Sequence, residues 1–75
     1  MDAQNFPAID TIWDYDQPQV TELKFRELLP AAERSGNKSY YTELLTQLAR
    51  TLSLQRKFDD AHEILNKAAQ LIEKT

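Results

Sequence analysis

The apolar positions in the second half of the chain recur at helical spacing. Leu45, Leu48 and Leu52 lie at i, i+3 and i+7, which places them on one face of a helix. A second stripe follows at spacings of three and four, made of Phe58, Ala61, Leu65, Ala68 and Ile72. The two stripes predict an antiparallel hairpin of helices over about residues 38–54 and 58–74.

An earlier helix is predicted over about residues 18–35. Its apolar face is supplied by Val20, Leu23, Phe25, Leu28, Leu29 and Ala32. Pro18 is tolerated in a first turn, and Asp16 can accept a hydrogen bond from the amides there. Pro30 removes an internal hydrogen bond, so we expect a kink at this residue with the helix resuming beyond it. The alternative is that the helix stops at Leu29.

Two short turns separate the three predicted helices. Gly36 suits the left-handed position at the end of the first helix, and Asn37 can cap the second. Arg56 lies in the second turn and lacks the backbone freedom of glycine. This turn therefore either avoids the left-handed conformation or carries modest strain.

Residues 1–17 show no helical period and predict an extended arm. Pro7 and Pro18 both bias the residue before them to extended geometry. Trp13 and Tyr15 should tether the end of the arm to the helices, because large aromatic side chains lose much by staying in water. An apolar cap over the first helix is the simplest interpretation. The alternatives are a partner-binding motif, or an internal ligand that lies in a groove of the helices.

Composition narrows the class of protein. A chain of 75 residues forms one small domain, and it has no Cys to stabilise it through disulfides or thiolate metal sites. No apolar run exceeds two residues, which excludes a membrane span and a signal-peptide core, and no base precedes Lys24, which argues against a transit peptide. We therefore expect a cytoplasmic protein without a membrane partner.

The net charge of −3 is unevenly distributed. Residues 1–16 carry four acids and no base, whereas the rest carries eight acids and nine bases. Nucleic-acid binding needs a strongly basic surface, which the sequence lacks. We expect no nucleic-acid partner.

The sequence offers little catalytic chemistry. It has one His and no Cys, and because Gly36 is its only glycine it has no phosphate-binding loop. Asp59, His62 and Glu63 lie at i, i+3 and i+4 and could hold a divalent metal, but such spacing is common by chance at a solvated helix start. We expect no enzyme activity, no cofactor and no metal.

The C-terminal hairpin resembles one tetratricopeptide repeat, a helix–turn–helix unit. The matching positions are Leu45, Leu48, Ala49, Leu52, Ala61, Leu65 and Ala68. Glu73 stands where the family has Pro, and Arg56 where it usually has Gly. The alanines leave room for the neighbouring helix, so we expect Ala49, Ala61 and Ala68 to be buried where the two helices cross.

The first predicted helix looks like the second half of a preceding repeat. At an offset of 40 residues Phe25 matches Leu65, and residues 33–35 match residues 73–75 in chemical type. The chain thus resembles one and a half repeats of a longer type. The fold class expected from this is all-α: a tetratricopeptide-like superhelix fragment of three helices in antiparallel succession, with an extended N-terminal arm.

The resemblance implies a protein–protein interaction module that binds a peptide or protein. In this family the first helix of each repeat lines a concave groove. The positions that correspond here are Glu43, Thr46, Gln47, Arg50 and Ser53. Arg50 is the only base among them and could meet a ligand carboxylate, although simple solvation is an equal alternative.

The other interpretation is structural. About three repeats are normally needed for a stable array, so a shorter array leaves apolar surface to cover. Ile64 and Leu71 lie off the predicted stripe, which makes the third helix apolar on more than one side. We expect a two-fold homodimer with Ile64, Leu71 and Ile72 at the contact. The alternative is a segment of a longer repeat array without a separate ligand.

Overall fold

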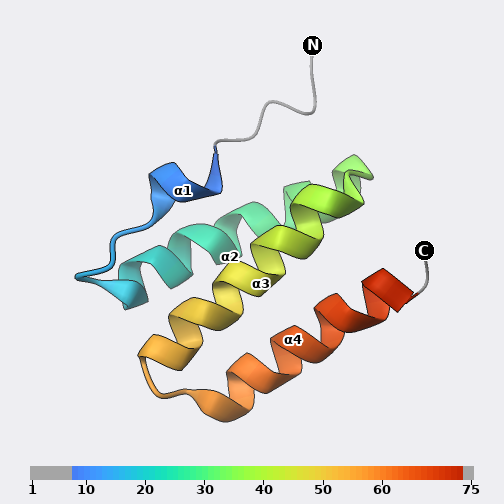
Figure 1. The fold of residues 1–75 in the computed structure, drawn as a ribbon. Helices are drawn as coiled ribbons and strands as arrows, with labels where there is room; N and C mark the ends of the chain where they lie inside the picture. Colours follow the sequence, from blue (N-terminus) through green and yellow to red (C-terminus); the bar gives the residue numbers. More distant parts are fainter. Residues whose placement is uncertain (1–7, 74–75) are drawn as a thin grey trace.

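Four helices form the chain in a computed structural model that describes residues 8–73 (Figure 1). They are α1 (Ile9–Ile12), α2 (Pro18–Ser35), α3 (Lys38–Leu54) and α4 (Phe58–Glu73). Within the described residues there is no strand, so the all-α prediction is confirmed. The helices α2, α3 and α4 run in alternating directions, as Figure 1 shows.

The central helix of the fold is α3. Both α2 and α4 pack against it, whereas α2 and α4 make little contact with each other. Seven buried side chains of α3 therefore dominate the core, namely Tyr41, Leu44, Leu45, Leu48, Ala49, Thr51 and Leu52. Within residues 8–73, α3 is therefore the main helical neighbour of α4, and much of the circumference of α4 is not covered by another described helix.

The arm differs from its prediction. Residues 9–12 form one helical turn, α1, so the described chain has four helices where the sequence predicts three. The carbonyl of Ala8 accepts hydrogen bonds from the backbone N–H of Thr11 at 3.1 Å and from its hydroxyl at 2.6 Å. The side chain of Ile9 is only 6% exposed and belongs to the core. A single turn is too short to show a helical period, which is why the pattern predicts extended chain. Pro7 and residues 1–6 lie outside the described residues.

The start of α2 also differs from its prediction, which places the cap at Asp16. Its N-cap is Gln17, without a side-chain hydrogen bond, so the predicted capping role of Asp16 is wrong. Instead the Asp14 carboxylate accepts the N–H of Asp16 at 3.1 Å, and the hydroxyl of Thr21 accepts the N–H of Asp14 at 2.9 Å. The helix continues through the exposed Pro30, so the alternative end at Leu29 is wrong too.

Both turns depend on a left-handed residue. Gly36 has φ 80°, and the side chain of Asn37 accepts the N–H of Tyr40 at 3.1 Å, as predicted. Arg56 has φ 64°. Its N–H donates to Ser53 at 2.9 Å and the next N–H donates to Leu52 at 2.8 Å, the pair of bonds that defines a Schellman motif. The second turn is therefore left-handed despite lacking glycine, which strains the backbone at Arg56.

The packing of α4 confirms one prediction and corrects another. Ala49, Ala61 and Ala68 are all buried, as the close-crossing argument requires. However, Ile64 and Leu71 pack against the core as half-buried side chains, while three residues of the predicted inner stripe point outward. Those residues are Phe58, Leu65 and Ile72, which are 63%, 45% and 62% exposed. Among the described helices α4 packs mainly against α3, so the contact follows the alanines and leaves the adjacent apolar side chains exposed.

Candidate protein-interaction face

One side of the molecule presents exposed side chains from both α3 and α4. We call it the α3–α4 face. It comprises Glu43, Thr46, Arg50 and Ser53 of α3, and Phe58, Leu65 and Ile72 of α4, all of which are exposed. Residues seven apart lie two helical turns apart on the same side of a helix, so the three α4 side chains form one apolar line along it.

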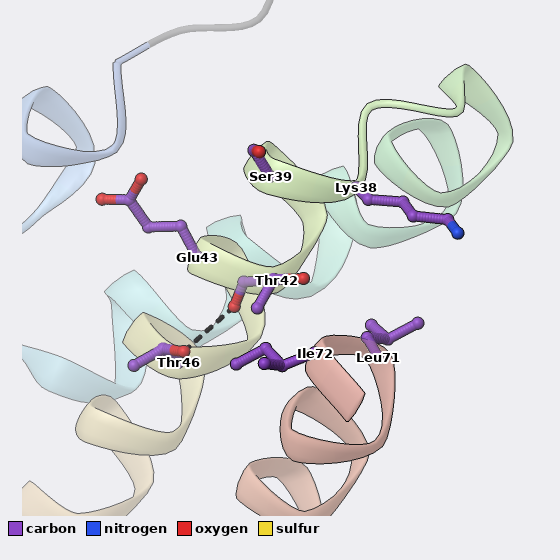
Figure 2. Close-up of a pocket in the computed structure, with 7 residues that line it drawn as sticks. All are labelled: Lys38, Ser39, Thr42, Glu43, Thr46, Leu71 and Ile72. Atoms are coloured by element: carbon purple, nitrogen blue, oxygen red, sulfur yellow. Dashed lines mark hydrogen bonds between the residues drawn. The ribbon is translucent and has the colours of Figure 1, made fainter. Parts of the chain in front are cut away.

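A pocket of about 440 Å³ lies at one end of this face (Figure 2). It is formed by the first turns of α3 and the last turn of α4, and its lining residues are Lys38, Ser39, Thr42, Glu43, Thr46, Leu71 and Ile72. Figure 2 shows Thr42 and Thr46 opposite the apolar side chains of α4, with the Thr46 hydroxyl bonded to the Thr42 carbonyl at 3.0 Å. The pocket thus brings together residues from the predicted groove and from the predicted self-association surface.

The arm covers the other edge of α3. The indole N–H of Trp13 donates to the side-chain oxygen of Gln47 at 2.9 Å. The same ring stacks on Tyr15, with centroids 4.6 Å apart, and meets the ring of Phe25 edge-on at 5.8 Å. Trp13 therefore tethers the arm, as predicted, while Tyr15 stays exposed. Gln47 is half-buried under this contact, which removes it from the open face.

Glu43 lies on α3 between the arm and the α3–α4 face. Besides the main pocket it lines a smaller one, of about 270 Å³, with Tyr40 and residues 8–10 of the arm. Burial raises the pKa of Tyr40, and the carboxylate of Glu43 raises it further. The phenol therefore stays neutral beside the carboxylate at neutral pH.

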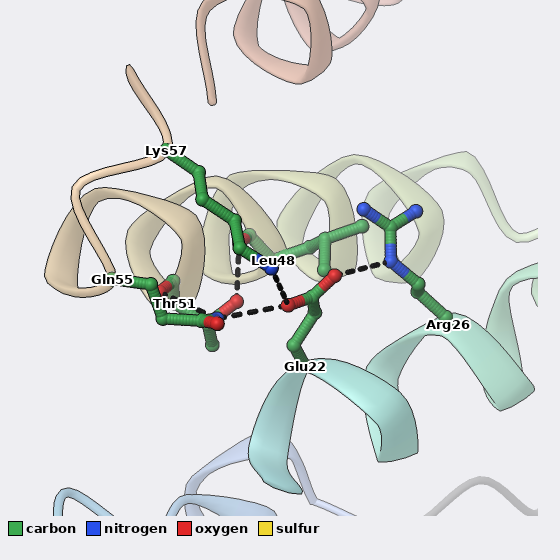
Figure 3. A network of polar contacts seen from close by, with 6 residues as sticks. All are labelled: Glu22, Arg26, Leu48, Thr51, Gln55 and Lys57. Atoms are coloured by element: carbon green, nitrogen blue, oxygen red, sulfur yellow. Dashed lines mark hydrogen bonds and ion pairs between the residues drawn. The ribbon is translucent and has the colours of Figure 1, made fainter. Parts of the chain in front are cut away.

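A polar cluster centred on Glu22 joins α2 to the turn before α4 (Figure 3). The spacing of Glu22 and Arg26 at i and i+4 predicts their ion pair, which is confirmed, whereas the contacts with Gln55 and Lys57 have no local signal in the sequence. The Glu22 carboxylate accepts hydrogen bonds from Arg26 at 2.7 Å and from the Gln55 amide at 2.8 Å, and the ammonium of Lys57 lies 3.6 Å away. Burial by itself would raise the pKa of Glu22, but these donors and positive charges outweigh it and the pKa is lowered. Within the described residues no buried side-chain polar atom lacks a hydrogen-bond partner. The cluster is therefore a satisfied structural network.

The described residues show neither a metal site nor a membrane-spanning helix. No group of three or more His, Cys, Asp or Glu side chains in residues 8–73 could hold a metal ion, and Asp59, His62 and Glu63 do not form one. In the same part of the chain no helix is both long enough and apolar enough to cross a membrane. Three of the six large hydrophobic side chains that are exposed within the described residues lie on the α3–α4 face.

Comparison with known proteins identifies no relative of this chain. No protein-family model matches the chain, and neither the curated proteins nor the solved structures include a match. The resemblance to a tetratricopeptide repeat therefore depends on the residues quoted above.

Proposed function

We propose that the protein is a non-catalytic protein–protein interaction module of tetratricopeptide type that binds an amphipathic helix of a protein across the α3–α4 face. The observation that supports this most is the exposed apolar line of Phe58, Leu65 and Ile72. Single exposed hydrophobic side chains are normal on a protein surface. Three that recur every seven residues along one side of a helix form the kind of apolar stripe that normally packs against another element.

The shape of the face suits a helical ligand. A helix of 16 residues such as α4 is about 24 Å long, and its apolar line runs over nearly that whole length. The α3 side of the face carries Thr46 and Ser53, and Ser39 lines the pocket at its end. These three residues are again seven apart and are small enough for another helix to approach closely. An amphipathic helix placed in such a groove is a common mode of peptide recognition.

Charge adds a second element of recognition. Arg50 is exposed on this face and can form a charge-assisted hydrogen bond with a carboxylate of the ligand. Replacing Arg50 with Ala should weaken the binding of an acidic helical peptide and flatten its dependence on salt. Binding that is indifferent to both changes would remove Arg50 from the site.

Self-association is the second candidate function, and the same apolar line favours it. An exposed face of this kind can also be covered by another unit of a longer repeat array or by a second chain, with no separate ligand. The two candidates share the face and differ in what occupies it.

A designed peptide tests the binding function. The probe is a helical peptide with leucine at the a and d positions of its heptads, and the control is the same composition scrambled to destroy the apolar face. We expect the probe to shift backbone amide signals of α3 and α4 around Thr46 and Leu65, and the scrambled peptide to shift none. Leu65→Lys on α4 should abolish the binding of the probe peptide. Leu23→Lys, which changes an exposed leucine on α2 away from the face, should preserve this binding. Absence of binding, or shifts confined to α1 and α2, would refute the proposal.

A further inference from the structure

We infer that the α3–α4 face binds a second copy of this chain in a two-fold dimer. The two-fold axis lies in the interface, perpendicular to the helices, and passes beside Leu65, so the two α4 helices run antiparallel. This inference rests on the proposed function, because it names the partner of the same face. It also corrects the composition of the predicted contact. The predicted contact consists of Ile64, Leu71 and Ile72. The first two are half-buried against the core, and only Ile72 belongs to the exposed apolar line with Phe58 and Leu65.

The apolar line is complementary to itself. Phe58 and Ile72 are each seven residues from Leu65, so an antiparallel pairing centred on Leu65 places Phe58 of one chain against Ile72 of the other at both ends. Leu65 then meets its own counterpart at the centre. A two-fold interface uses the same patch on both chains and requires this self-complementarity.

The charges on α3 fit the same axis. Because α3 and α4 form an antiparallel hairpin, positions at equal distance from the turn lie level, which places Thr46 beside Leu65 to within about one residue. Glu43 precedes Thr46 by three residues and Arg50 follows it by four. The rotation that pairs the two Leu65 side chains therefore brings Glu43 of each chain towards Arg50 of the other.

Both charged groups are available for this pairing. Glu43 and Arg50 are exposed, and neither takes part in the ion pairs found within the described residues, which centre on Glu22. Opposite charges that meet across an interface fix its register and disfavour other arrangements. If the two-fold axis lay parallel to the helices instead, α4 would cover α3 of the second copy and the Glu43–Arg50 pairing would be lost.

The expected dimer is weak. The face is two helices wide, with axes about 8–10 Å apart, so it falls at the small end of specific interfaces, which typically bury about 1,200–2,000 Å² in total. We therefore expect a dimer that dissociates on dilution. The small side chains of Ser39, Thr46 and Ser53 allow the two α3 helices to approach, so the apolar lines of α4 can also meet.

Sedimentation of the full chain over a range of concentrations tests the inference. We expect a mass approaching twice the chain mass of 8.7 kDa at high concentration and falling towards 8.7 kDa on dilution. Leu65→Lys places two positive charges beside the axis and should give a monomer throughout, with its helical circular dichroism unchanged because Leu65 is outside the core. Leu23→Lys is the matched control and should leave the association unchanged.

Charge reversal tests the register. Glu43→Arg alone, or Arg50→Glu alone, converts both attractive pairs into repulsive ones and should weaken association by about tenfold or more. The combined variant, with both charges exchanged, should restore it. Single reversals that leave association unchanged would overturn the proposed pairing.

The remaining outcomes separate this inference from the proposed function. A wild-type chain that stays monomeric at every concentration overturns the inference, while the helical peptide can still bind the open face. A dimer that persists in Leu65→Lys also overturns it, because that dimer must use another surface. A dimer that is lost in Leu65→Lys, retained in Leu23→Lys and restored by the exchanged charges supports it.

Discussion

Trp13 donates its indole N–H to the side-chain oxygen of Gln47 at 2.9 Å, and this bond joins the arm to α3 across 34 positions of sequence. It fixes one edge of α3 under the arm and leaves the opposite edge, towards α4, as the open face. The arm thus determines which part of α3 remains exposed.

The contribution of this bond can be measured by a double-mutant cycle. Trp13→Phe keeps an aromatic ring but removes the donor, so the free energy of unfolding should fall by about 1 kcal/mol. Gln47→Ala removes the acceptor of the same bond. Since the bond can be lost only once, the double variant should be less destabilised than the sum of the single variants, by about 1 kcal/mol in urea unfolding. Additive effects would show that the bond contributes nothing.

The Glu22 cluster predicts a dependence on pH. The pKa of Glu22 is lowered in the folded chain from its ordinary value of 4.5. Its ionised form therefore stabilises the fold above pH 4.5, and this contribution is lost as the pH falls through the lower, folded-state pKa. Glu22→Gln should lower the free energy of unfolding by about 2 kcal/mol at neutral pH, because it weakens bonds to charged donors. The difference from wild type should shrink in acid; a constant difference would contradict this.

The strained turn predicts an unusual stabilising substitution. Arg56 adopts φ 64°, a left-handed conformation that costs a residue with a Cβ roughly 1–2 kcal/mol. Arg56→Gly relieves this strain but increases the entropy of the unfolded chain, so we expect a net gain of up to about 1 kcal/mol in thermal unfolding. Gly36→Ala is the converse change at φ 80° and should destabilise by about 1 kcal/mol. Opposite signs would mean that neither turn holds a left-handed residue in solution.

The crossing of α3 and α4 predicts the effect of larger side chains. Ala61 and Ala68 are buried where the helices are closest, so Ala61→Leu or Ala68→Leu should overpack the crossing and destabilise by about 1–3 kcal/mol. Ala31→Leu, at an exposed position of α2, is the control and should change stability by less than about 0.5 kcal/mol. Unchanged melting of both buried variants would show that the helices do not cross at these residues.

The sequence predicted the parts of this fold that local spacing determines. The bounds of α2 and α3, the left-handed Gly36, the cap at Asn37 and the buried alanines all follow from residues within a few positions of one another. The helical turn α1 was missed because four residues are too few to show a period. Its placement depends on the burial of Ile9, which no local pattern reveals.

The candidate site was predicted less completely, for two physical reasons. The resemblance to a tetratricopeptide repeat implies a groove position for Gln47, but its side chain bonds Trp13, which is 34 residues away in the sequence. Two adjacent lines of α4 are apolar: one contains Ala61 and Ala68, and the other contains Leu65 and Ile72. Periodicity alone therefore could not decide which of the two lines faces α3. The small side chains decide it, because they allow the closest approach of the two helices.

A cysteine at position 65 provides the most direct test of the proposed dimer. The chain has no Cys, so Leu65→Cys introduces a single thiol. If the two-fold axis passes beside this residue, the two thiols meet and mild oxidation should link the chains covalently, since disulfides need Cα atoms within about 7 Å. Phe58→Cys is the matched control: in the antiparallel dimer its two copies lie about 20 Å apart along α4, so it should not cross-link. Rapid linkage through position 65 alone is the predicted result. Equal linkage at both positions, or none at position 65, would contradict the antiparallel dimer.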